Sequence, residues 1–434
     1  MRVLIRNCER IILGLDPVTV TEGPDILVED GLVKEVGKID PLSHPDAVTV
    51  DGSGTLAMPG NVCSHHHYYS GLSRGIMADI GPTPDFISTL QQLWWRIDRA
   101  LDPESIYYSS LICSIDAIRA GTTTVIDHHS SPNCISGSLD AIRDGFMETG
   151  LRGMTCYEVS DRNRGMDEVS EGIEENLRFI ARLEREAASG IPMMEAAIGG
   201  HAPFTIPDAG LDMMRAAVEE SGRGIHMHIA EDLYDLSFSH DRYRRDLVAR
   251  LHEKGLIDSM SLLVHGLYLS DDDIAIVNDA DGFLIHNARS NMNNHVGYCT
   301  RLPAVRNSAL GTDGIGADMF EEFKFAFFKN RDAGSPLWPD DYLSALNRGN
   351  EILRRYFRGR FGYIEPGSVA DIILLDYHSP TPLTADNFAG HLAFGLGSAS
   401  VKTVLINGKV VMENREFPFD IENIYREAAK HAGS

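Results

Sequence analysis

Histidine and carboxylate side chains stand at the ends of several short apolar segments of this chain. The first segment ends in Ser64-His65-His66-His67, and another in His226-Met227-His228, followed by Glu231. Two further segments end in His265 and in Asp313. Imidazole and carboxylate groups are the usual protein ligands of zinc, so a cluster of these ends predicts a metal site.

Alternation along a strand decides which of these side chains can act together. Successive residues of a strand point to opposite faces, so His65 and His67 can face one metal ion while His66 points away. By the same rule His226 and His228 share a face, and the pattern leaves open whether His226 is a packed core histidine. Taken singly, His265 fits a packed histidine and Asp313 a turn residue. Their position at matching strand ends favours the metal site.

Three imidazoles, one carboxylate and a water suit zinc with an open coordination position, although the same donors also bind iron or manganese. Such an ion lowers the pKa of its bound water from 15.7 to about 7, which makes hydroxide available at neutral pH. Glu231, three residues after His228, is well placed to move protons beside it.

The elements that must position these residues alternate between strand and helix. From 59 to 365, short apolar strands, beginning with one predicted at 58–64, are separated by helical stretches such as 174–184 and 211–220. Eight strands in this pattern predict a (β/α)8 TIM-like barrel, in which catalytic residues lie at the carboxyl ends of the strands.

Both ends of the chain show antiparallel β patterns, with Asn407-Gly408 as a hairpin turn between two apolar runs. We therefore expect an α/β protein whose small β-sandwich domain is built from both termini. The predicted division is 1–58 for the first part of that domain, 59–365 for the barrel, and 366–434 for its second part plus a tail helix.

Composition narrows the function further. The net charge of −24 argues against nucleic acid and anionic membranes as partners. No uninterrupted apolar run is long enough for a signal peptide or a membrane helix, and six cysteines without a CxxC pair suggest reduced thiols. We expect a cytoplasmic protein. The missing CxxC also excludes a cytidine-deaminase-type zinc site.

Several motifs resemble those of the amidohydrolase superfamily, in the order in which that family has them. They are Met58-Pro59-Gly60 with His65-x-His67, His228-Ile229-Ala230-Glu231, His265 after SLLV, and Leu310-Gly311-Thr312-Asp313-Gly314. Gly121-Thr122-Thr123-Thr124 and Gly200-His201-Ala202-Pro203-Phe204 are similar to its deaminase and chlorohydrolase branch. Leu93-Trp94-Trp95-Arg96 and Asp127-His128-His129 resemble most closely the SsnA group of aminohydrolases.

The resemblance implies roles for individual residues. His65, His67, His228 and Asp313 would bind one divalent metal ion, His265 would polarise the bound water, and Glu231 would protonate the substrate ring. His201 would contact substrate. No lysine stands where two-metal relatives have a bridging one, so a single metal is favoured. Asn287-Ala288 replaces the Cys-Pro step of many relatives, and the resemblance also implies a homodimer.

These observations predict a metal-dependent hydrolytic deaminase of a nitrogen heterocycle such as a purine, pteridine, pyrimidine or triazine. The alternatives are a ring-opening cyclic amidase or a hydrolase that expels another group; a non-enzymatic metal-binding protein would need neither Glu231 nor His265. Trp94, with Trp95 and Phe86, either lines the pocket for a flat substrate or packs a helix on the barrel. Arg162 either binds a substrate carboxylate or pairs with a surface acid.

Overall fold

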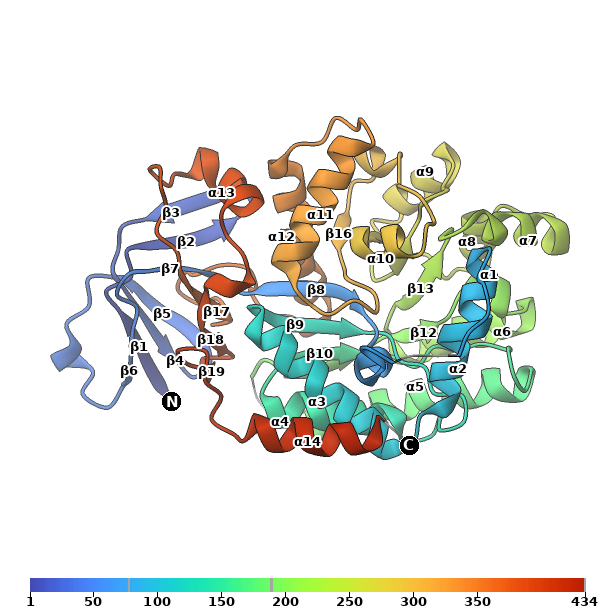
Figure 1. Cartoon of the computed structure of the whole chain (residues 1–434), viewed down its shortest axis with the longest axis horizontal. Helices are drawn as coiled ribbons and strands as arrows, with labels where there is room; N and C mark the ends of the chain where they lie inside the picture. The colour runs from blue at the N-terminus through green and yellow to red at the C-terminus, as the bar shows by residue number, and fades with distance from the viewer. Residues whose placement is uncertain (77–78, 188–189, 433–434) are drawn as a thin grey trace.

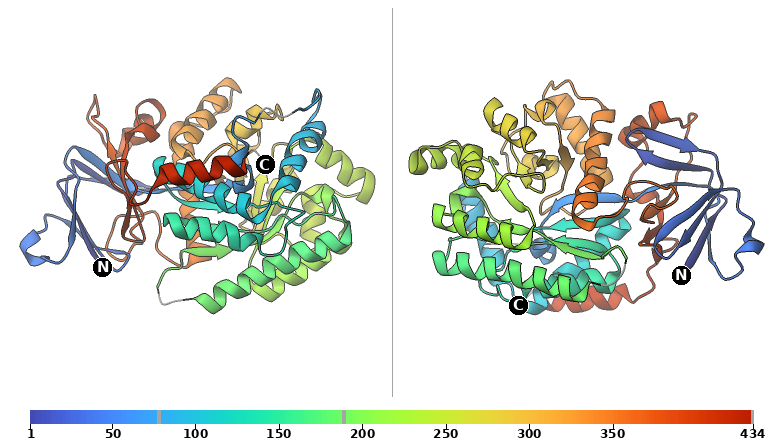
Figure 2. Two further views of the ribbon diagram at one scale, coloured as in Figure 1. Left: turned by 60° about the horizontal axis from the view of Figure 1, so that its bottom comes forward. Right: turned by 180° about the vertical axis from the view of Figure 1, so that it is seen from behind.

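Two lobes make up the computed structural model, which describes residues 1–76, 79–187 and 190–432. Figure 1 shows β-sheets from both ends of the chain on one side and a ring of strands and helices on the other. The same two lobes can be distinguished in both further views in Figure 2. No helix in the described ranges is long and apolar enough to cross a membrane.

The larger lobe is a barrel of parallel strands. Nine strands of the described chain occupy eight positions, because β11 and β12 follow one another in the same position: β8 (Asn61–His66), β9 (Thr122–Asp127), β10 (Arg152–Thr155), β11 (Met194–Ala196), β12 (Ile198–Gly200), β13 (Ile225–Ile229), β14 (Leu262–His265), β15 (Phe283–His286) and β16 (Ser308–Leu310). They pair in the orders β8 to β11 and β12 to β16. Parallel bridges from His66 to Asp313 and from Val159 to Gly200 join the two groups, so the predicted barrel is confirmed.

Helices cover the outside of this barrel. Its strands are buried almost throughout, as parallel strands with helices on one face and a packed interior on the other require. The covering helices are α3 (Pro103–Arg119), α4 (Ser138–Thr149), α5 (Met166–Glu186), α6 (Asp208–Ser221), α7 (Leu233–Tyr243), α8 (Leu247–Glu253), α9 (Asp271–Asp279), α10 (Ala288–Asn293), α11 (Met319–Asp332) and α12 (Pro339–Phe357). The short helices α1 (Phe86–Thr89) and α2 (Trp95–Ala100) follow the first barrel strand.

The smaller lobe contains two sheets with strands from both ends of the chain. One has the order β5-β4-β1-β6 and the other β19-β18-β17-β7-β2-β3. The strands are β1 (Arg2–Arg6), β2 (Arg10–Leu15), β3 (Val18–Thr21), β4 (Asp25–Glu29), β5 (Leu32–Gly37), β6 (Val48–Asp51), β7 (Thr55–Pro59), β17 (Ile372–Asp376), β18 (Val401–Ile406) and β19 (Lys409–Met412). Asn407 and Gly408 both have positive φ between the antiparallel β18 and β19, which confirms the predicted hairpin.

The predicted single strand at 58–64 is wrong. The chain forms β7 in the small lobe, breaks at Gly60, and starts β8 in the barrel. A side chain at Gly60 would come within 2.2 Å of Thr123, so only glycine permits this close passage between the lobes.

The carboxyl end of the chain returns to the barrel. Helix α13 (Phe388–Phe394) packs near α11 and α12, and α14 (Ile421–His431) lies along α3 in Figure 1. Ile424 and Ala428 of α14 bury their side chains in a cluster with Ile112 and Ile115 of α3. The tail helix therefore packs on the barrel rather than on the small lobe. The boundaries after 58 and 365 stay proposals, and residues 433–434 of the last predicted segment lie outside the described chain.

Candidate active site

Four side chains from three barrel positions converge at the carboxyl ends of the strands. The Nε2 atom of His228 lies 3.3 Å from Nε2 of His65 and 3.2 Å from Nε2 of His67. The Asp313 Oδ1 atom lies 2.9 Å from His67 Nε2 and 3.7 Å from His65 Nε2. Ligands bound tetrahedrally to zinc at about 2.0–2.1 Å lie about 3.3 Å from one another, so this donor set fits the geometry of one such ion.

The protonation states of these residues suit a cation. Burial lowers the pKa of His65 and His228 well below the ordinary value, so both rings are neutral and have a free lone pair. Burial alone would raise the pKa of Asp313, but the charge of His67 and the hydrogen bonds to His65 and His67 together outweigh it and lower the pKa well below its ordinary value. At His67 burial is likewise outweighed by Asp313, and the pKa rises to about 9. The space between His67 and Asp313 therefore favours a positive charge, which either a proton or a metal ion supplies.

His66 points away from the cluster, and one of its ring nitrogens meets the backbone carbonyl of Asp313. The backbone turns sharply at two of the strand ends. His265 has φ of +73° and Asp313 has φ of +53°, both in the left-handed region that non-glycine residues seldom adopt. Such strained positions are concentrated in functional sites, where neighbouring structure holds them. Here the turns bring both side chains toward the converging histidines.

Glu231 and His265 lie beside this cluster. The His265 Nε2 atom is 3.4 Å from Glu231 Oε2 and 4.0 Å from Asp313 Oδ2. The Nδ1 atom of His265 lies 2.9 Å from the side-chain oxygen of Asn291, to which it donates, so Nε2 keeps its lone pair. Burial, and then the charge of Asp313, raise the pKa of Glu231 well above its ordinary value. This shift favours the protonated form of Glu231.

Helix α10 and the residue that caps its carboxyl end, Asn294, hold these groups in place, a role that the sequence reasoning missed. Ser290 donates a hydrogen bond to Asp313 Oδ2, Asn291 accepts one from His265, and Asn294 donates one to Glu231 Oε1 at 3.3 Å. The signal was available, because this segment directly follows the seventh barrel strand, in the stretch 287–291 that departs from the family pattern.

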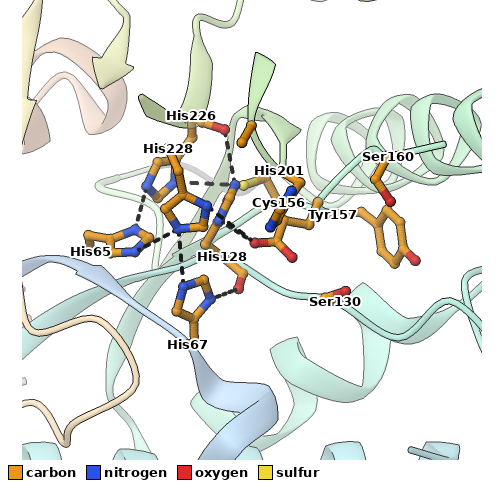
Figure 3. Close-up of polar contacts among 12 residues, drawn as sticks. His65, His67, His128, Ser130, Cys156, Tyr157, Ser160, His201, His226 and His228 are labelled. Carbon is orange, nitrogen blue, oxygen red and sulfur yellow. Dashed lines mark hydrogen bonds and ion pairs between the residues drawn. The ribbon is translucent and has the colours of Figure 1, made fainter. Parts of the chain in front are cut away.

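The outward-facing nitrogens of the three converging histidines also have partners, and Figure 3 labels those of His65 and His67. His65 Nδ1 lies 2.9 Å from His226 Nε2, and His67 Nδ1 lies 2.6 Å from the backbone oxygen of His128. The Nδ1 atom of His228 lies 3.6 Å from Oε1 of the buried Glu158. His226 thus lies behind His65 and outside the four converging residues. His128 and Glu158 follow the second and third barrel strands, and sequence reasoning assigned neither a role.

An aromatic pocket opens onto the converging residues. Its wall contains Phe86, Leu90, Trp94, Trp95 and Phe204, and its floor includes His67, His228, Glu231 and Asp313. Trp94 and Trp95 follow α1, where a π-helical turn (Leu90–Trp94) leads into α2. Both tryptophans line the pocket and also pack against the hydrophobic core. Pocket lining and helix packing, the two alternatives for this insertion, therefore do not exclude one another.

Two polar residues predicted to contact substrate also line this pocket. His201 Nδ1 lies 2.8 Å from Thr205 Oγ1, whose proton goes to the Ala202 carbonyl, so His201 Nε2 is an acceptor. Burial lowers the pKa of His201 to about 3, which keeps the ring neutral. Arg162 is paired 2.9 Å from Asp98, and both side chains are buried. Of the two interpretations of Arg162, pairing with a surface acid does not hold, because its partner Asp98 is buried; contact of Arg162 with substrate stays a prediction.

Comparisons with known proteins define the class. The model of the amidohydrolase family matches residues 56–411, and the chain belongs to this family. It is 30% identical to a 5-methylthioadenosine/S-adenosylhomocysteine deaminase of Desulforudis audaxviator, over 100% of this chain and 98% of that protein.

Two solved structures share the fold. An adenosine deaminase from Xanthomonas campestris with bound zinc has a TM-score of 0.83 at 23% identity, covering 99% of this chain and 98% of that one. An atrazine chlorohydrolase from Arthrobacter aurescens complexed with zinc has a TM-score of 0.83 at 21% identity, covering 99% and 100%.

Family membership confirms the predicted enzyme class, a hydrolase that acts on carbon–nitrogen bonds other than peptide bonds. The finer resemblance to the SsnA group stays a prediction.

Proposed function

We propose that the protein is a metal-dependent hydrolytic deaminase that releases ammonia from an amino-substituted nitrogen heterocycle, with an adenine nucleoside as the first candidate. The observation that carries this proposal is the position of Glu231, a buried carboxyl group beside His265 that lies between the converging His/Asp cluster and an aromatic pocket. A protonated carboxyl at that place can donate to a ring nitrogen. The adenine-nucleoside deaminases among the relatives support the choice of ring.

One divalent metal ion would be held by His65, His67, His228 and Asp313, with zinc favoured over iron or manganese. When bound, such an ion makes a water molecule acidic enough to attack at neutral pH. The described residues nearest the cluster include no lysine that could bridge a second ion.

The chain's own residues would then manage the protons. Glu231 donates its proton to the ring nitrogen next to the carbon under attack, which removes the negative charge that would otherwise build up there. His265 Nε2 and Asp313 would accept one proton of the attacking water and return it to the departing amine, and the second proton of that water would return to Glu231 as the new carbonyl forms. Both acceptors lie within 4.0 Å of each other and beside Glu231, so each transfer is short.

The pocket would orient the ring. Trp94 provides an aromatic surface for a flat substrate. His201 Nε2 accepts a hydrogen bond from a substrate N–H or O–H. Arg162 is held by Asp98 and lies 4.9 Å over the Trp95 ring, so it stiffens the aromatic wall as well as contributing charge.

A second candidate function uses the same residues to expel a group other than ammonia. The structural similarity to a chlorohydrolase favours its inclusion. Ring opening of a cyclic amide is the third possibility. Nothing in the arrangement of Glu231, His265 and Asp313 distinguishes the bonds that are broken, so the products must be identified.

The experiment is ammonia release by the metal-loaded enzyme on aminopurines and adenine nucleosides, then on pteridines, aminopyrimidines and aminotriazines. Release from a purine supports the proposal and its ring class. An inactive panel with one metal ion per chain would reject deamination, and mass spectrometry of chloro- and methoxy-substituted rings and cyclic amides would test the alternatives.

The homodimer and the cytoplasmic location are proposed with the enzyme. The acidic surface supports the expectation that neither nucleic acid nor membrane is a partner. Light scattering of the purified protein tests the dimer, and a mass of one chain would reject it.

A further inference from the structure

Among the residues that the structure describes, the buried carboxylate of Glu158 has two ion-pair partners, and both are histidines. Its side chain is 4% exposed, and its Oε1 atom lies 3.2 Å from Nδ1 of His128 and 3.6 Å from Nδ1 of His228. It follows β10 at the carboxyl end of the barrel, and its backbone N–H bonds the His129 carbonyl at 2.8 Å. Burying a carboxylate is costly unless charged or hydrogen-bonding groups compensate it, so its place next to His228 calls for an explanation.

The contacts of the His228 ring assign a different role to each of its two nitrogens. Its Nε2 atom faces Nε2 of both His65 and His67, so Nε2 is the atom that a metal ion would take. A neutral histidine that binds through Nε2 carries its proton on Nδ1, the atom that faces Glu158. In metalloproteins a carboxylate acceptor at that place fixes the tautomer and the ring orientation, and raises the basicity of the ligand.

His128 connects the same carboxylate to the other two histidines. Its Nε2–H donates to the His226 carbonyl at 3.0 Å, and its own carbonyl accepts from His67 Nδ1. The His226 ring in turn lies 2.9 Å from His65 Nδ1 (Figure 3). Glu158, which faces His128 Nδ1, therefore contacts the network that holds all three rings.

A second metal ion explains these contacts less well. His67, His128, Glu158 and His228 have donor atoms within 4.8 Å of one another. However, His67 and His228 direct Nε2 toward the first cluster, and His67 Nδ1 is bonded to a carbonyl. Only His128 Nδ1 and Glu158 remain, which are too few for a protein-bound divalent ion of this kind.

We propose that Glu158 is a positioning residue, whose carboxylate faces the Nδ1 atoms of His228 and His128 and so orients the metal-binding face of the histidine cluster. This inference rests on the proposed metal-dependent function. It adds a requirement that no motif of the active site contains, namely a carboxylate at the end of the third strand.

The test is zinc affinity, measured by competition with a chromophoric chelator, for wild type, Glu158→Gln and Glu158→Asp. Glu158→Gln should bind zinc about 10–100-fold more weakly. Glu158→Asp, which keeps the charge on a shorter side chain, should recover part of the loss. Glu168→Gln is the matched control, because Glu168 is equally buried but bonds only Ser160, Asn163 and Arg164 and lies outside the pocket. It should bind zinc like wild type.

Kinetics at saturating zinc separate positioning from substrate contact, since Glu158 also borders the pocket. When saturating zinc refills the metal site of Glu158→Gln, KM should stay near the wild-type value. Wild-type zinc affinity in Glu158→Gln, a raised KM with affinity intact, or two zinc ions per wild-type chain would each overturn the inference. Wild type that binds no zinc would instead refute the proposed function. Thermal melting of the metal-free variants checks that they fold. If Glu158→Gln does not fold, the zinc affinity of Glu158→Asp is compared with that of wild type instead.

Discussion

Replacing Glu231 by glutamine tests the proton transfer on which the proposed mechanism depends. Glutamine has nearly the same volume and retains an oxygen that can accept from Asn294, which donates to Glu231 at 3.3 Å. The variant should therefore fold and bind metal normally. It lacks the acidic proton, and loss of a general acid slows a reaction about 10²–10⁴-fold. That range corresponds to about 3–5 kcal/mol of activation free energy.

The structure favours the middle of that range or above. Burial and the charge of Asp313 raise the pKa of Glu231 well above its ordinary value, which favours the protonated acid that glutamine cannot replace. We expect kcat of Glu231→Gln to fall about 10³-fold, with the metal content unchanged. The assay is steady-state ammonia release together with elemental analysis, and Glu168→Gln is the control for a buried carboxylate outside the pocket. A variant that turns over within a few-fold of wild type would refute the role given to Glu231.

Three further predictions concern the surroundings of the site. Arg152, fully buried and 3.1 Å from Asp371, joins the two lobes, so Arg152→Met should lower the free energy of unfolding by about 3–5 kcal/mol in urea titrations; a loss under 1 kcal/mol would contradict this. Trp94→Ala should raise KM about 10-fold with less effect on kcat, because stacking is lost; an unchanged KM would show that Trp94 only packs the core. Burial raises the pKa of Asp127 to about 6, so its folded form holds the proton more tightly; this stabilisation is complete below pH 4 and about 3 kcal/mol is lost as pH rises through 6, a slope that Asp127→Asn should remove from denaturation curves.

Much of the fold could be predicted from local pattern. Strand and helix alternation predicts the barrel, and residue alternation on β8 places His65 and His67 on one face with His66 turned away. Pro59-Gly60 is a local signal for a break within 58–64, but it does not show that the chain passes from one lobe to the other there. That passage depends on how closely Thr123 of the next strand packs against Gly60, which only the assembled fold shows.

The outer contacts of the site were harder to predict for a physical reason. Glu158 and His228 are 70 positions apart, and only the strand register brings them within 3.6 Å. Arg162 and Asp98 meet in the same way, across 64 positions. A single carboxylate after a strand has no local signal that distinguishes it from a solvated loop residue. The residues that converge on the site can be predicted from their positions at strand ends. Their hydrogen-bond and ion-pair partners can be identified only in the assembled barrel.

The measurement that tests the central claim most directly is the metal content of the purified protein, taken alongside ammonia release before and after chelation. We predict one divalent ion per chain, most of it zinc, no ammonia release from an adenine nucleoside after the ion is removed, and recovery when zinc is restored. His67→Ala should lose the ion. A chain that holds no metal ion, or one that deaminates equally well without it, would contradict the account.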